Sequence, residues 1–216
     1  MLIKTIFFDL DGVVIDSEKL HLRALGLTLE KNGILFQHTI LDGFVGRSDK
    51  SFFQYVYENI DYRIDIEDFL KQKDALFESL LAELRFVEGF TDFMHVVKDA
   101  NIQTALVTSS SLQTVQKVDR LLNFSHSFDI IITEDDTIKH KPHPDPYLLA
   151  LERSGADKEA TIIIEDSING IIAGKAAGCI VCGLTTSFDG TTLKNAGADF
   201  VFESYKDLVT KFCCFK

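Results

Sequence analysis

The amino-acid sequence predicts an α/β fold: a Rossmann-like parallel sheet with helices on both faces, plus a small inserted α-helical cap domain. Two observations carry this prediction. Short apolar runs of strand-forming residues alternate with longer amphipathic stretches along most of the chain, and one region near the N-terminus holds only helical patterns. Strands that alternate with helices pair in parallel, because each crossover places a helix against a face of the sheet.

Short segments rich in Ile, Val, Phe or Thr are the expected strands. They are 5–8 (TIFF), 104–107 (TALV), 129–132 (DIII), 161–164 (TIII), 179–184 (CIVCGL) and, with the weakest pattern, 199–202 (DFVF). Amphipathic helical patterns lie between them, as at 111–124 and 146–156. Strand and helix therefore alternate through the second half of the chain.

The region after the first strand breaks this alternation. From about residue 17 to 84 the apolar spacing in LHLRALGLTLEKNG and IEDFLKQKDALFESLLAEL is helical, with Glu and Lys on the other faces. The region has no linker composition, so we expect it to be ordered. The expected division is an α/β catalytic core over 1–16 and 89–216, and a helical cap over 17–88.

Composition limits the partners. The chain has 216 residues, 46% of them hydrophobic, and a net charge of −11, so a sizeable core is expected and an anionic partner is repelled. We expect neither a nucleic-acid nor a membrane partner, and a cytoplasmic monomer or weak oligomer that binds small molecules. The N-terminal MLIKTIFF is too short for a signal segment and runs directly into acids.

The cysteines are Cys179, Cys182, Cys213 and Cys214, and the first two form a C-x-x-C pattern. That pattern also occurs in zinc sites. In a strand, however, a separation of three residues points the two side chains to opposite faces. We therefore expect buried, reduced thiols rather than a zinc site.

Polar residues follow four of the expected strands. In an open parallel sheet, ligands bind beyond the carboxyl ends of the strands, so these residues should share one edge. They are Asp9 and Asp11, Thr108 and Ser109, the lysines of KHKPHPDPY, and Glu165 and Asp166. Clustered carboxylates suit Mg²⁺, while lysine and hydroxyl donors bind phosphoryl oxygens, so this set of groups indicates phosphoryl transfer.

The motifs DLDGVV, VTSSS, KPHPDPY and IIIEDSINGIIAGKAAG resemble, in order and spacing, the four motifs of the haloacid dehalogenase-like superfamily. VIDSE followed by a helical region is similar to its subfamily with a small helical cap, which includes β-phosphoglucomutase and many sugar-phosphate and phosphoglycolate phosphatases. The resemblance covers nearly the whole chain. It implies a Mg²⁺-dependent enzyme that acts on a small phosphorylated metabolite.

The resemblance also implies roles for the first and second strand ends. Asp9 matches the nucleophile, and Asp11 matches the general acid/base that also offers its backbone carbonyl to Mg²⁺. Thr108 matches the hydroxyl that contacts the phosphoryl group, with Ser109 beside it as the weaker choice. Gly12 is expected to permit a tight turn after the acids.

The remaining matches concern the lysine and the metal. Lys141, directly before Pro142, matches the lysine that balances the charge of Asp9 and the phosphoryl group, and Lys139 is the rival. Asp166 matches a direct Mg²⁺ ligand, with Glu165 either a ligand or the partner of a metal-bound water. The implied metal residues are Asp9, Asp11, Glu165 and Asp166. Any single acid after a strand is equally explained as a turn former or N-cap, but those needs do not account for the whole set.

The cap is expected to select the substrate. His21 and Lys73 fall where the mutase branch has a histidine and a substrate-reaching lysine, although His21 is equally explained as a surface residue of an amphipathic helix. In GFVGRSDKS, Arg47 or Lys50 is placed to meet a distal substrate group.

Two departures from the mutase pattern matter. Asp49 stands where the mutase has an arginine, and Glu88 stands where a proline is usual. We therefore expect a phosphohydrolase for a sugar phosphate or similar metabolite, with a phosphosugar mutase as the alternative and a catalytically silent metabolite-binding protein as a third, weaker reading. Asp11 argues against a dehalogenase, since halide departure needs no acid there.

Overall fold

The computed structural model describes residues 3–45 and 49–212. The chain folds into two compact units, one of 1–16 with 85–216 and the other of 17–84. Arg47, which the sequence singled out, lies outside the described residues, as do Cys213 and Cys214.

The first unit is built on a parallel six-stranded sheet in the order β3-β2-β1-β4-β5-β6. The strands are β1 (Thr5–Phe8), β2 (Gln103–Val107), β3 (Ile130–Ile132), β4 (Thr161–Glu165), β5 (Ile180–Leu184) and β6 (Phe200–Phe202). All six overlap the expected segments, and the predicted fold class is confirmed. After β1 the chain adds β2 and β3 toward one edge of the sheet, and it then adds β4, β5 and β6 toward the other edge. The topological switch point therefore lies between β1 and β4.

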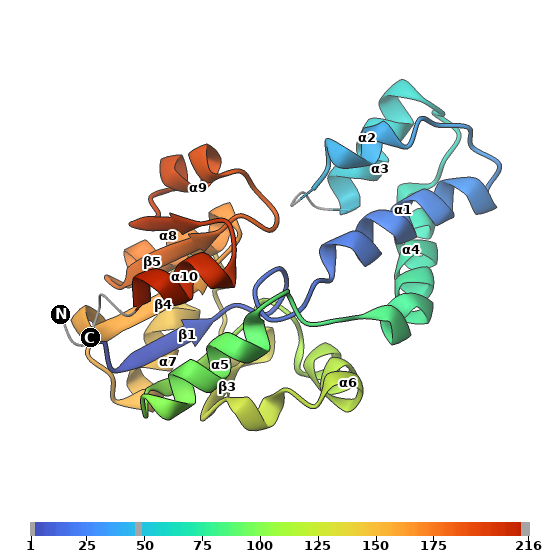
Figure 1. Ribbon diagram of the computed structural model, residues 1–216. Helices are drawn as coiled ribbons and strands as arrows, with labels where there is room; N and C mark the ends of the chain where they lie inside the picture. The colour runs from blue at the N-terminus through green and yellow to red at the C-terminus, as the bar shows by residue number, and fades with distance from the viewer. Residues whose placement is uncertain (1–2, 46–48, 213–216) are drawn as a thin grey trace. The chain divides into compact units, whose positions relative to one another are not determined.

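Helices cover both faces of this sheet (Figure 1). They are α5 (Phe90–Asp99), α6 (Leu112–Leu122), α7 (Asp145–Ser154), α8 (Ile168–Ala176), α9 (Gly190–Ala196) and α10 (Tyr205–Phe212). Helices α7, α8 and α9 pack in sequence over the strands, whereas α5 and α10 pack against each other.

Adjacent residues of β1 show how the two faces are filled. Phe7 belongs to a buried cluster with Tyr147 of α7 and Ile171 of α8. Phe8 instead packs edge-on against Phe90 and Phe93 of α5. Because consecutive strand residues point to opposite faces, the continuous apolar run TIFF is what a strand buried on both sides requires.

The parallel register aligns the strand ends that carry polar residues. Phe8 is level with Leu106 of β2 and with Ile164 of β4. The residues that follow, Asp9 on one strand and Glu165 on the other, therefore emerge at the same edge of the sheet.

The second unit is helical, as the sequence indicated. It contains α1 (Glu18–Lys31), α2 (Thr39–Asp42), α3 (Asp49–Asn59) and α4 (Ile66–Leu80), followed by the 3-10 turn η1 (Leu81–Glu83). Helix α4 packs against both α1 and α3. The unit has its own apolar core, which includes Leu25, Leu29, Phe52, Phe53 and Phe69.

The return from the helical unit lies at 84/85, earlier than the expected 88/89. Backbone pairing explains the difference: the amide of Asp16 donates to the carbonyl of Arg85 at 2.9 Å, and the amide of Val87 donates to the carbonyl of Val14 at 3.0 Å. Residues 85–87 are therefore paired with the segment that leaves the sheet.

Two further expectations concern cysteines and membranes. Cys179 and Cys182 are buried free thiols, as predicted, and burial raises the pKa of Cys182 to about 12. Among the helices of the described residues, none has both the length and the hydrophobicity that crossing a membrane requires.

Candidate active site

Asp9 begins the tight turn that follows β1. Its amide donates to the carbonyl of Ile164 at 3.1 Å, which ties the turn to β4. Gly12 has a φ of +72°, and a Cβ at this position would lie 1.9 Å from Oδ2 of Asp166. Gly12 is therefore required both for its left-handed backbone and for the space that Asp166 occupies.

The side chain of Lys141 is 4% exposed and joins two carboxylates. Its Nζ donates to Oδ1 of Asp9 at 2.6 Å, to Oε1 of Glu165 at 2.7 Å, and to the carbonyl of Val107 at 2.9 Å. These three contacts use all three ammonium protons. Burial alone would lower the pKa of Lys141, but the charges of Asp9 and then Glu165 raise this pKa above its usual value, so the side chain is protonated at neutral pH.

Glu165 is fully buried at the end of β4. Its Oε1 accepts from Lys141 and, at 2.8 Å, from the hydroxyl of Tyr147, whose ring centroid lies 4.8 Å from the lysine Nζ. Its Oε2 accepts from the amide and the hydroxyl of Ser167 at 3.2 and 3.0 Å. Both oxygens are thus held by protein donors. Gly170 makes room, because a Cβ there would lie 1.7 Å from Oε1.

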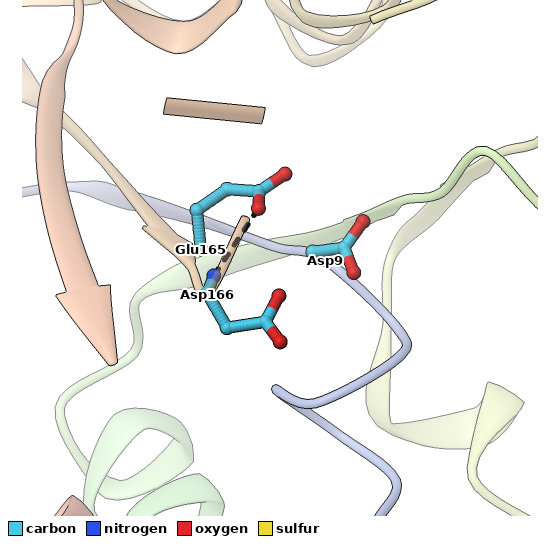
Figure 2. Close-up of side chains that lie close together, drawn as sticks. All are labelled: Asp9, Glu165 and Asp166. Atoms are coloured by element: carbon cyan, nitrogen blue, oxygen red, sulfur yellow. Dashed lines mark hydrogen bonds between the residues drawn. The ribbon is translucent and has the colours of Figure 1, made fainter. Parts of the chain in front are cut away.

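Asp9, Glu165 and Asp166 form a buried acidic cluster (Figure 2). One carboxylate oxygen of each lies within 4.8 Å of the others. Burial, followed by the charges of Glu165 and Asp11, raises the pKa of Asp9 to about 7 even though Lys141 opposes the shift. Burial and the neighbouring charges of Glu165 and Asp9 also raise the pKa of Asp166.

The acidic cluster fits a hard divalent cation. Its ligand atoms are all carboxylate oxygens, which Mg²⁺ prefers, and their negative charges oppose one another. Among the described residues, Asp9 and Glu165 are ion-paired with Lys141, while Asp166 forms no ion pair. A divalent cation would supply the positive charge that this arrangement lacks.

The second strand end contributes hydroxyls. Thr108 is buried directly after β2, and its Oγ1 accepts from the amide of Ser110 at 3.0 Å. Ser109 is exposed. Ser110, which the sequence reasoning missed, donates from Oγ to Oδ2 of Asp11 at 3.2 Å. The run of three serines in VTSSS was the available signal, but it does not show which serine points to Asp11.

Lys139 does not take the position of Lys141. Lys139 and His140 are both exposed. Nδ1 of His143 lies 2.9 Å from Oδ1 of Asp145, so the H-x-x-H pattern of His140 and His143 forms no part of the acidic cluster.

Residues that follow β5 also contact the acidic site, and this contact was not predicted. Ser187 donates a short hydrogen bond from Oγ to Oδ2 of Asp166, and Thr186 donates from Oγ1 to the carbonyl of Gly12 at 2.6 Å. The rule that ligands bind beyond strand ends applies equally to TTS after β5. Ser and Thr are so common in turns that the sequence alone provides no reason to assign these residues to the site.

Within the helical unit, two of the expected cap residues meet. Nζ of Lys73 lies 2.8 Å from Nδ1 of His21 and 2.5 Å from Oδ2 of Asp49. The Lys73 side chain is 2% exposed, and the ring of Phe77 stacks on that of His21 with centroids 4.0 Å apart. Asp49, noted from the sequence only as a departure, is therefore the charge partner of a buried lysine.

Comparison with known proteins identifies relatives over most of the chain. The family model described as haloacid dehalogenase-like hydrolase matches residues 6–184. A phosphorylated carbohydrates phosphatase of Thermotoga maritima is 30% identical over 201 residues, covering 90% of this chain and 92% of the relative.

Solved structures agree with this relationship. A protein from Thermotoga maritima that is provisionally named a β-phosphoglucomutase superposes with a TM-score of 0.82 at 27% identity, covering 96% of this chain and 98% of that one. CbbY from Rhodobacter sphaeroides in complex with phosphate gives a TM-score of 0.73 at 27% identity, with 96% of each chain covered. The chain therefore belongs to the haloacid dehalogenase-like hydrolase family.

Proposed function

We propose that this protein is a Mg²⁺-dependent phosphatase that hydrolyses a small phosphorylated metabolite, a sugar phosphate in particular, through an aspartyl-phosphate on Asp9. The observation that carries the proposal is the contact of Lys141 with both Asp9 and Glu165 beside Asp166. Transfer of a phosphoryl group to a carboxylate requires a carboxylate nucleophile, a cation beside it and a further acid nearby. All three lie at one edge of this sheet.

In the first half-reaction, a carboxylate oxygen of Asp9 attacks phosphorus, and the bond from phosphorus to the ester oxygen breaks. Asp11 gives its proton to the departing oxygen, which leaves as an alcohol. In the second half-reaction, Asp11 takes a proton from water as the water oxygen attacks phosphorus. The acyl-phosphate bond breaks, and Asp9 and inorganic phosphate are released.

Thr108 is the proposed hydrogen-bond donor to the phosphoryl oxygens, with Ser109 as a further contact, and Lys141 is proposed to balance the negative charge of Asp9 and the phosphoryl group. Lys141 is already held by Asp9 and Glu165, so its charge is in place before substrate binds and costs little reorganisation. The proposed metal residues are Asp9, Asp166 and the backbone carbonyl of Asp11, and bound Mg²⁺ would neutralise charge on the phosphoryl group.

Glu165 is proposed to act mainly through Lys141. Since both of its oxygens already accept hydrogen bonds from protein donors, we assign it chiefly to anchoring Lys141. Its contribution to the metal is then to hold a metal-bound water or to bind through a remaining lone pair.

His21 and Lys73, with Arg47, are proposed to recognise the part of the substrate away from phosphorus. The charge of Lys73 is balanced by Asp49 at 2.5 Å. A balanced pair favours hydroxyl groups over a second anionic group, because a second anion would have to compete with the carboxylate of Asp49. This supports a sugar monophosphate, in keeping with the relative named a phosphorylated carbohydrates phosphatase.

A phosphosugar mutase is the second candidate. The contact between Lys73 and His21 favours it, because both residues match positions of the mutase branch. The mutase would pass the phosphoryl group on Asp9 to a sugar hydroxyl instead of water. Asp49 in place of an arginine argues for the hydrolase. A catalytically silent binding protein is the least supported, since it would not need Asp11 beside Asp9.

The experiment is a panel of hexose, pentose and small-acid phosphates, incubated with enzyme and Mg²⁺, in which inorganic phosphate and isomerised product are both measured. Phosphate release faster than isomer formation supports the hydrolase. Isomer formation faster than phosphate release would establish the mutase, and no turnover of any compound would contradict both.

The working form is proposed to be a cytoplasmic monomer or weak oligomer without nucleic-acid or membrane partners. The net charge of −11 supports this, because an acidic surface repels both kinds of polyanion. Light scattering over a range of protein concentrations tests the assembly state.

A further inference from the structure

Two consecutive hydroxyls after β5 contact the acidic site from a strand that supplies no acid. The turn that carries them is fixed to the sheet, since the amide of Thr185 donates to the carbonyl of Phe202 at 3.0 Å. From this turn Ser187 donates to Oδ2 of Asp166, and Thr186 donates to the carbonyl of Gly12 at 2.6 Å.

The division of protons between the two hydroxyls is settled by distance. Each hydroxyl has one proton to donate. Thr186 lies 3.4 Å from Oδ2 of Asp166 but 2.6 Å from the carbonyl of Gly12, so its proton goes to Gly12. Ser187 is then the donor to Asp166. In the described part of the chain, Oδ1 of Asp166 has no hydrogen-bond donor, whereas Oδ2 is held.

We infer that Ser187 is a positioning residue for cation binding: it holds Oδ2 of Asp166 and so presents Oδ1 to a divalent cation. Thr186 fixes the carbonyl of Gly12, one residue beyond the proposed carbonyl ligand of Asp11, and so ties the same turn to both metal-binding segments. This inference rests on the proposed function in one respect, namely that Asp166 binds Mg²⁺. Hydrogen-bond partners of metal ligands fix ligand orientation, and their loss typically weakens metal binding by about 10- to 100-fold.

The alternative is that Ser187 only satisfies a buried carboxylate and so stabilises the fold. The two roles differ in what they change. A purely structural hydroxyl affects the unfolding temperature of the metal-free protein, whereas a positioning hydroxyl also affects the dissociation constant for Mg²⁺.

Calorimetric titration of the full chain with Mg²⁺ alone, without substrate, measures this constant. We expect Ser187→Ala to raise the Kd for Mg²⁺ by about tenfold or more, and Ser187→Thr to keep the Kd close to the wild-type value, because the hydroxyl is kept. Ser187 lines a cavity of about 560 Å³, so the added methyl group has room.

Ser204→Ala is the matched control, since Ser204 makes the same kind of bond, from Oγ to Oδ2 of Asp207 at 2.8 Å, at the start of α10. It should lower the unfolding temperature slightly and leave the Kd for Mg²⁺ unchanged. If Ser187→Ala fails to fold, Ser187→Cys keeps the volume with a weaker donor and should still raise the Kd.

The outcomes separate the inference from the proposed function. If the wild type binds Mg²⁺ and Ser187→Ala or Ser187→Cys binds it with the same Kd, the inference alone is overturned. Equal loss in Ser187→Thr and Ser187→Ala also overturns it. A wild type that binds no Mg²⁺ overturns both the inference and the proposed metal dependence.

Discussion

The Nζ atom of Lys141 lies 2.6 Å from Oδ1 of Asp9, although 132 positions separate the two residues in the chain. The same Nζ lies 2.7 Å from Oε1 of Glu165. The parallel sheet makes this contact possible, because the ends of β1 and β4 are level and the loop after β3 reaches the same edge. The cation therefore stands between the proposed nucleophile and a buried acid before any substrate is bound.

Substitution of Lys141 and substitution of Asp166 should have different effects on activity. Lys141→Ala removes the charge beside Asp9, and we expect kcat at saturating Mg²⁺ to fall by about a hundredfold or more, as for loss of other groups that stabilise developing charge. Asp166→Ala removes an anionic ligand, so the Mg²⁺ concentration needed for half-maximal activity should rise strongly. Steady-state rates across a Mg²⁺ series measure both. An identical response of the two variants to added Mg²⁺ would contradict this division.

Tyr147→Phe tests the anchor of Glu165. The ring beneath Lys141 is kept, but the 2.8 Å hydrogen bond to Oε1 of Glu165 is lost. A bond to a charged group contributes about 1.5–3 kcal/mol, and about 1 kcal/mol shifts Tm by 2–4 °C in a chain of this size. We expect Tm to fall by several degrees. Thermal unfolding followed by circular dichroism measures it, and an unchanged Tm would show that the hydroxyl does not support Glu165.

Asp136 should make stability depend on pH. Burial opposes ionisation, but hydrogen bonds from Thr133 and then the contact with Arg153 hold the pKa of Asp136 below its usual range. A carboxyl group with a lowered folded-state pKa stabilises the protein above its unfolded pKa of about 3.9, and this contribution is lost as pH falls through the folded value.

Asp136→Asn should therefore lower Tm at pH 7, and the difference from the wild type should close as pH falls below about 4. Thermal unfolding of both proteins at several pH values provides the measurement. A Tm difference that is constant with pH would mean that the charge of Asp136 does not contribute.

The cap residues should affect sugar substrates selectively. We expect His21→Ala and Lys73→Ala to lower kcat/KM on the best sugar phosphate by about tenfold and to change turnover of a small aryl phosphate much less, because the lost contacts are not to phosphorus. Asn32→Ala is the control, as it removes a bond between the residue that follows α1 and helix α4, Asn32 Nδ2 to Gln72 Oε1 at 2.9 Å. Equal losses on both substrates would exclude a role in sugar recognition.

Much of the core and its site was predictable because strand patterns are local. Each strand is a short apolar run, and a parallel sheet places every strand end at one edge, so Asp9, Asp166 and the lysines of KHKPHPDPY could be grouped from the pattern. The choice of Lys141 over Lys139 came from the family resemblance. Gly12 was expected for its backbone, and the approach of Asp166 supplies a second reason.

Contacts that depend on tertiary packing were not predictable. The burial of Lys73 and its pairing with Asp49 require α3 and α4 to pack together, and nothing local to either residue indicates this. Thr186 and Ser187 look like ordinary turn residues, and only the hydrogen bonds to Gly12 and Asp166 distinguish them. The end of the helical unit was misplaced by a few residues, because the backbone pairing of 85–87 leaves no side-chain pattern.

The most direct test of an aspartyl-phosphate mechanism is phosphate release from an aryl phosphate by the wild type and by Asp9→Asn, each with Mg²⁺ and with a chelator. The amide keeps the shape of the carboxylate but cannot attack phosphorus, so we expect Mg²⁺-dependent release by the wild type and none by the variant. Circular dichroism confirms that the variant is folded. Retained turnover by folded Asp9→Asn would contradict the mechanism and indicate attack by a metal-activated water instead.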